Sequence, residues 1–230
     1  MNVKLLCSLP IAALFLVGTS RADAMSFTTF QTRDAFDRAV GANSLSTQDF
    51  NSIETPVDFR NSSVTVGELT LSDTSGFRAR IGRAPATLPT LNINNTPLAQ
   101  LSARDANGAA IAFNESITAF GATFAAISDG GRDTRFVFED GSNLAIPFRG
   151  AGMTLSDNGF FGFVASSPIR SFSFRRFDGV AADGFSVDNV LFKPAQEAPT
   201  QAVPTPALLP GLIGIGIAAI KRKIKSSKSE

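Results

Sequence analysis

ITAFGATFA, residues 117–125, has the side-chain period of a β-strand and predicts the fold of the domain around it. Because successive side chains of a strand point to opposite faces, Phe120, Ala122 and Phe124 share one face. The same period recurs downstream in two phenylalanine pairs, Phe136 with Phe138 and Phe172 with Phe174. We expect these rings to fill a core between two sheets, because large aromatic side chains dominate such cores.

Short runs rich in β-branched and aromatic residues surround this segment and alternate with Gly, Asn, Asp and Pro. That pattern is typical of an antiparallel β-sandwich, so the fold class that we predict is mainly β. Asp140-Gly141 is a tight-turn signal and predicts a hairpin over residues 134–147. The predicted strands are residues 26–30, 47–50, 64–66, 69–72, 110–113, 117–125, 134–139, 143–147, 160–165, 169–174 and 184–192.

One short N-terminal helix is predicted over residues 32–40. Thr32 suits its N-cap, Phe36 and Val40 lie four residues apart on one face, and Gly41 ends it. Residues 74–107 contain three prolines and few strand signals, so we expect them to form a long excursion over the surface.

Composition excludes several kinds of chemistry. The 230 residues contain no His, Trp or Tyr, and the single cysteine is Cys7. Catalysis by a Ser-His-Asp or Cys-His pair and His-ligated zinc are therefore excluded. Residues 25–202 carry 14 basic and 18 acidic residues, a net charge of −4, and Lys193 is their only lysine. A mildly acidic body of this kind is a poor binder of nucleic acid.

The N-terminus predicts export. Lys4 gives a positive start, residues 5–17 are mostly apolar, and Ala22-Asp23-Ala24 has the small residues of a cleavage site. We expect residues 1–24 to be a signal peptide and Met25 to begin the mature protein. Cys7 lies inside this signal, so the exported protein would fold without disulfides.

The C-terminus has three parts in order. Pro204-Thr205-Pro206-Ala207 comes first, the uncharged run 208–220 follows, and the basic residues Lys221, Arg222, Lys223 and Lys225 come last. The 13 residues of the run span only ~20 Å as a helix, less than the ~30 Å hydrocarbon core, so we expect a short transmembrane helix. The basic residues should stay on the cytoplasmic side and leave the body outside.

This arrangement resembles the sorting signals of the PEP-CTERM class, and residues 204–207 spell the motif of its cyanobacterial PTPA-CTERM variant. The resemblance implies that a membrane protease of the exosortase type reads the motif, cleaves near it and releases or transfers the body. An ordinary membrane anchor with a Pro-rich stalk is the alternative. The domain plan is a signal peptide (1–24), a β-sandwich domain (25–195), a linker (196–203) and a sorting tail (204–230).

Asp188 is the most distinctive polar residue of the body. If Phe185, Val187 and Leu191 face the core, Asp188 points to the opposite face, where a lone carboxylate in a strand is costly. A hard cation would relieve that cost. The closing residues 183–190 resemble those of jelly-roll carbohydrate-binding modules, which implies a structural Ca²⁺ shared by Asp188 and an early acidic residue, here Asp49. An exposed or arginine-paired Asp188 is the alternative.

Arginines far outnumber the single lysine of the body and allow two interpretations. They either cover apolar edges and pair with Asp, or form a patch for an anionic polysaccharide. The arginines considered for this patch are Arg132, Arg135, Arg149, Arg170, Arg175 and Arg176. The Asp- and Gly-rich loops 128–133 and 178–184 are expected to be turns.

We therefore expect a non-enzymatic protein of the cell envelope or extracellular matrix, anchored transiently in the bilayer by its tail. Its body is either a glycan- or matrix-binding module or a coat protein that self-associates. A carboxylate-based glycan hydrolase is a distant alternative, since it needs two acids about 5–9.5 Å apart and usually aromatic sugar platforms. Tyr and Trp, the usual platforms, are missing from the sequence.

Overall fold

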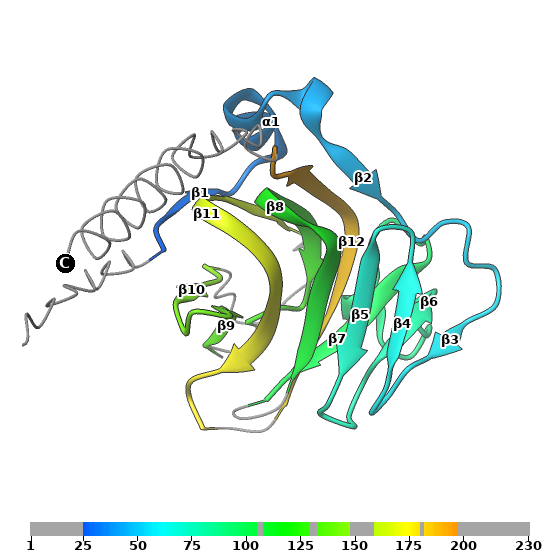
Figure 1. Ribbon diagram of the computed structural model, residues 1–230. Helices are drawn as coiled ribbons and strands as arrows, with labels where there is room; N and C mark the ends of the chain where they lie inside the picture. Colours follow the sequence, from blue (N-terminus) through cyan, green and yellow to red (C-terminus); the bar gives the residue numbers. More distant parts are fainter. Residues whose placement is uncertain (1–24, 105–107, 129–132, 148–158, 180–181, 197–230) are drawn as a thin grey trace, which may run out of the picture. The chain divides into compact units, whose positions relative to one another are not determined.

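The computed structural model describes residues 25–104, 108–128, 133–147, 159–179 and 182–196. Within them, twelve strands join in one antiparallel sheet with few helices (Figure 1). The mainly β prediction is therefore confirmed. The predicted signal peptide (1–24) and the predicted sorting tail (204–230) lie outside the described residues. None of the helices in the described segments is long and apolar enough to span a bilayer.

The strands of the N-terminal half are mostly short, and those of the C-terminal half include three long ones. The first half contains β1 (Phe27–Phe30), β2 (Ser46–Gln48), β3 (Val57–Asp58), β4 (Ser63–Val66), β5 (Leu69–Asp73), β6 (Arg80–Gly82) and β7 (Leu98–Ala103). The second half contains β8 (Ala109–Ala125), β9 (Thr134–Phe138), β10 (Asn143–Ala145), β11 (Gly159–Arg176) and β12 (Asp183–Pro194). The helices are α1 (Arg33–Val40) and the single 3₁₀ turns η1 (Ala42–Ser44) and η2 (Pro89–Leu91).

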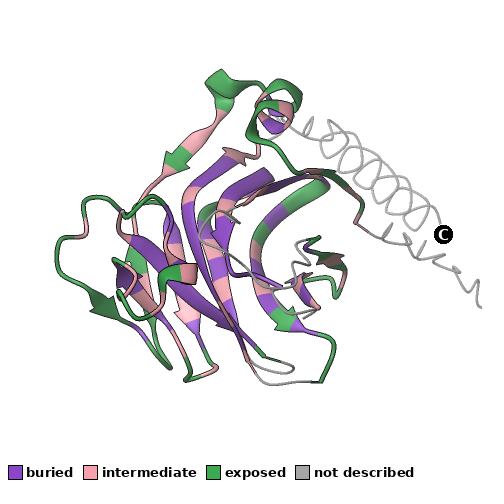
Figure 2. Cartoon of the chain, turned by 180° about the vertical axis from the view of Figure 1, so that it is seen from behind, coloured by how far each residue is buried: buried purple, intermediate pink, exposed green. Residues whose placement is uncertain are grey.

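The long strands organise the sheet because each has different partners along its length. The main strand order is β10-β9-β11-β8-β12-β7-β6-β3. Away from this path, β1 pairs with β11, β2 pairs with β12, and β5 pairs with both β4 and β8. β8 and β11 pair with one another and bend visibly along their course (Figure 1). Much of the central part of the sheet is coloured as buried in Figure 2.

The predicted phenylalanine faces are confirmed as core. All seven residues named for them, including Ala122, lie in the largest cluster of buried hydrophobic side chains, which we call the main core. Phe136 has the most ring neighbours, because phenylalanines of β8, β9 and β11 surround it. Burying apolar surface is the dominant favourable term in folding, so this cluster should carry much of the stability.

The predicted helix is also confirmed. The Thr32 hydroxyl accepts a hydrogen bond from the Ala35 amide at 3.4 Å, and Gly41 ends the helix with a φ of +83°. The buried Phe36 packs against β11, where Gly162 allows its ring a close approach. A Cβ at Gly162 would come within 2.8 Å of that ring, so this position needs a glycine.

The predicted hairpin forms as β9 and β10. The amide of Gly141 donates to the carbonyl of Phe138 at 3.0 Å, and Gly141 adopts a φ of +81°. Glycine supplies this conformation at no steric cost, which is why the Asp-Gly pair was informative.

Two pairs of predicted strands are each one continuous strand. Residues 110–113 and 117–125 both belong to β8, and residues 160–165 and 169–174 both belong to β11. Each strand swaps the parity of its core-facing residues at an irregularity in the pairing of β8 with β11. In β8, Phe113 and Ile117 face the main core before the swap, and Phe120 faces it afterwards. The broken alternation therefore mimics a strand end.

The expected surface excursion over residues 74–107 is wrong in part. It contains β6 and β7, and every residue of β7 is buried between β12 and β6. The two polar residues of β7 are accommodated by hydrogen bonds. The Gln100 amide donates to the carbonyl of Arg83, and the Ser102 and Ser75 hydroxyls lie 2.6 Å apart. Ala, Gln and Ser gave β7 no hydrophobic alternation to detect.

Candidate functional site

Asp188 lies at an irregularity of β12. Asn189 adopts a φ of +51°, and the pairing with β8 shifts register between Asp188 and Leu191. Asparagine tolerates this left-handed conformation better than most residues. The prediction that Leu191 shares a face with Phe185 is wrong, because the shift turns Leu191 out of the main core and into the cluster under α1.

The side chain of Asp188 is buried with few polar neighbours. The residue is 2% exposed, and its carboxylate accepts hydrogen bonds from the Thr96 hydroxyl at 3.1 Å and the Asn189 amide at 2.8 Å. Burial raises the pKa of Asp188 above its ordinary value, and the nearby Asp49 carboxylate raises it further. The two hydrogen bonds oppose this rise because they favour the charged form.

Asp49 follows β2 directly, and β2 pairs with β12 through Gln48 and Val190. That pairing places Asp49 beside the irregularity of β12, close enough for its charge to act on Asp188. One carboxylate oxygen of Asp49 accepts a hydrogen bond from the Asn51 amide at 3.1 Å. The two acids predicted to share a cation are thus neighbours in the fold.

A Ca²⁺ ion takes six to eight oxygen ligands. Asp188 and Asp49 supply carboxylates, and the Thr96 hydroxyl lies against Asp188. The described residues contain no group of three or more His, Cys, Asp or Glu placed to hold a metal. Backbone carbonyls and water would therefore have to complete the ligand set, and the shared calcium stays a prediction.

A pocket of about 360 Å³ lies between Asn51 and Pro97, two residues that are close in sequence to Asp49 and Thr96. Asn51 comes two residues after Asp49, and Pro97 follows Thr96. The lining residues are Asn51, Ile53, Glu54, Pro56, Arg80, Arg83 and Pro97. The pocket thus combines two guanidinium groups, one carboxylate and an amide with an apolar wall, which suits a small polar ligand.

The predicted arginine patch is only partly assembled. Arg132 and Arg149 lie outside the described residues. Arg170 donates to the carbonyl of Asn114 at 2.9 Å, and Arg176 is buried and bonded to Asp178. Arg135 and Arg175 are direct cross-strand neighbours on β9 and β11.

Sequence reasoning missed Thr96, Arg80, Arg83 and Arg104, because all four belong to the stretch expected to be a long excursion over the surface. The close spacing of Arg78, Arg80 and Arg83 was the one local signal available. No local pattern marks Thr96, whose contact with Asp188 spans 92 residues of sequence. The loops 128–133 and 178–184, expected to be turns, lie partly outside the described residues.

Comparisons of the chain with protein-family models and with curated proteins find no match.

Proposed function

We propose that this protein is exported to the cell envelope or extracellular matrix and that its C-terminal tail is a sorting signal. In this proposal the tail inserts in the bilayer, and an exosortase-type protease reads Pro204, Thr205, Pro206 and Ala207. The basic residues 221–225 fix the orientation. The sequence of residues 1–24 and 204–230 supports this route from both ends of the chain.

The observation that carries the proposal is where the folded domain ends. β12 finishes at Pro194, and the Ala195 amide donates to the carbonyl of Ser116 at 2.7 Å. The first compact unit of the chain also ends at Ala195. Cleavage near residues 204–207 would therefore remove no strand and no core residue of the described domain. A sorting signal that is cleaved off after delivery requires this.

We further propose that the domain is a jelly-roll-like sandwich without catalytic activity that binds or builds matrix. Polysaccharide binding with a structural calcium at Asp188 and Asp49 is the alternative that the buried carboxylate of Asp188 and its neighbour Asp49 support. The pocket between Asn51 and Pro97 is lined by one carboxylate, Glu54, whereas a glycoside hydrolase uses two. A hydrolase therefore remains the least supported candidate.

The test is to change the motif and follow processing in the native host. Replacing Pro204 and Pro206 by alanine should leave an uncleaved precursor in the membrane fraction, seen as slower migration on a denaturing gel. Replacing Thr200 and Gln201 in the linker by alanine is the matched control and should leave processing unchanged. Normal cleavage of the motif variant would contradict the proposal.

A further inference from the structure

Three arginines lie side by side where β7, β9 and β11 meet at one end of the sheet. Arg175 of β11 is paired with Arg135 of β9, and Arg104, which follows β7, forms a bridge with Arg175. Like charges placed opposite one another destabilise a sheet. Asp133 offsets Arg135 through two hydrogen bonds, but Arg104 and Arg175 form no ion pair with a described residue. Within the described residues, no ion pair therefore offsets the repulsion between Arg104 and Arg175.

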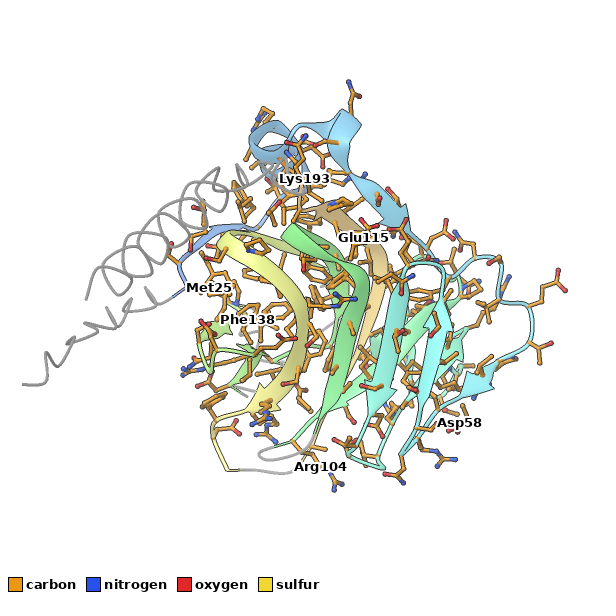
Figure 3. The ribbon with its side chains drawn as sticks, in the orientation of Figure 1. Met25, Asp58, Arg104, Glu115, Phe138 and Lys193 are labelled. Atoms are coloured by element: carbon orange, nitrogen blue, oxygen red, sulfur yellow. The ribbon has the colours of Figure 1, made fainter. Side chains whose placement is uncertain are left out.

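Two exposed phenylalanine rings flank this row. Phe77 is 46% exposed and Phe177 is 50% exposed, whereas nearly all other described phenylalanines are buried or half-buried. The guanidinium of Arg104 lies 5.5 Å from the Phe77 ring centroid, and that of Arg135 lies 4.7 Å from the Phe177 centroid. Phe77, Arg104, Arg135, Arg175 and Phe177 together form what we call the Arg–Phe surface. Figure 3 labels Arg104 at this end of the domain.

Phe77 is held in its exposed position by a buried carboxylate. Asp73 is 1% exposed and accepts hydrogen bonds from the amides of Asn61, Ser75 and Gly76 and from the Ser75 hydroxyl. The same hydroxyl accepts a bond from the Phe77 amide at 3.1 Å. These bonds fix the loop that carries the ring.

Phe177 is fixed in a similar way. Its amide donates to the carbonyl of Asp133 at 3.0 Å, and the Asp133 amide donates to the Asp178 carboxylate at 3.0 Å. The Asp178 carboxylate also accepts a hydrogen bond from the guanidinium of the buried Arg176, which adds positive charge beneath the Arg–Phe surface. Both rings are thus held toward solvent by polar networks, although burying them would be favourable.

The chemistry of the Arg–Phe surface specifies its ligand. Guanidinium groups bind carboxylates in a bidentate geometry, and an exposed ring packs against the apolar face of a sugar. Neighbouring strands lie about 4.8 Å apart, so the row presents cations at a regular spacing to a repeating anion. Nucleic-acid affinity grows with the number of phosphates neutralised, and three arginines on a net acidic body neutralise few.

We propose that the Arg–Phe surface binds an acidic polysaccharide whose sugars carry carboxylates. Arg104 and Arg175 bind the carboxylates of successive sugars of the polysaccharide. Phe77 and Phe177 pack against the sugar rings that lie between and beside these carboxylates. This inference deepens the proposed function, on which it rests, by naming a binding surface and a ligand class.

The test measures binding of the full chain, purified in mild detergent and immobilised, by biolayer interferometry. The probes are a polyuronate, a sulfated polysaccharide, neutral dextran and single-stranded DNA. We expect the polyuronate to bind best and to dissociate as NaCl rises. The Arg104→Gln/Arg175→Gln double variant should bind it about tenfold more weakly, as for the loss of two exposed ion pairs. Phe177→Ala should also weaken binding.

Arg33→Gln/Arg38→Gln is the matched control, because it removes the same charge from the exposed face of α1 instead. It should leave binding unchanged. Unchanged binding by the Arg104/Arg175 variant, loss of binding by the α1 variant alone, or tighter binding of dextran, the sulfated chain or DNA would each overturn the proposal. The processing of the tail is measured separately, so failure of this surface and failure of the sorting proposal are distinguishable.

Discussion

Replacing Phe136 by alanine should be among the most destabilising single changes in the domain. Its side chain is fully buried, and seven other phenylalanine rings have centroids within 5.0 to 6.4 Å of its own. Phe→Ala changes in cores cost about 3–5 kcal/mol, and aromatic pairs add to the loss from burial alone. We therefore expect about 5 kcal/mol, a large part of the ~5–15 kcal/mol that stabilises a typical domain.

Thermal unfolding followed by circular dichroism measures this effect. For a domain of this size, 1 kcal/mol shifts the Tm by about 2–4 °C, so Phe136→Ala should lower it by roughly 10–20 °C. Phe177→Ala is the control, because that ring is 50% exposed and its removal should cost less than about 1 kcal/mol. Equal Tm values for the two variants would refute the assignment of Phe136 to the centre of the core.

Three other perturbations test the remaining parts of the account. Burial raises the pKa of Asp188 in the folded state, so the contribution of this group to stability is full below the unfolded pKa and falls as the pH rises through the folded pKa. Measured in EDTA, the unfolding free energy of wild type relative to Asp188→Asn should therefore decrease from pH about 3 to about 7. A constant difference over this range would contradict the burial of Asp188. If Asp188 and Asp49 share a calcium, Ca²⁺ should raise the Tm of wild type and leave that of Asp188→Asn unchanged, whereas a chelator titration without effect on wild type would argue against the metal. Thr32→Ala should lower the unfolding free energy by about 0.5–1 kcal/mol through loss of the α1 cap, and an unchanged urea midpoint would show that the cap is dispensable.

Local signals predicted the parts of the fold that depend on nearby residues. Thr32, Phe36 and Gly41 define α1 within one turn of chain, and Asp140-Gly141 defines its hairpin by turn geometry alone. The phenylalanine faces were visible because alternation persists within each half of a long strand.

Long-range register accounts for most of what the sequence did not predict. Asn189 adopts a left-handed conformation and turns Leu191 to the other face, and nothing nearby in the sequence specifies that choice. β7 is buried by its position between two strands, with Gln100 among its residues. The Arg–Phe surface likewise depends on the bridge between Arg104 and Arg175, which are 71 positions apart in the chain.

The most direct test of the account is mass spectrometry of the C-terminus of the mature protein isolated from its native host. The account predicts a chain that ends at or near residues 204–207 and lacks the apolar run and basic end. A correctly located product that retains residues 203–230 intact would contradict it.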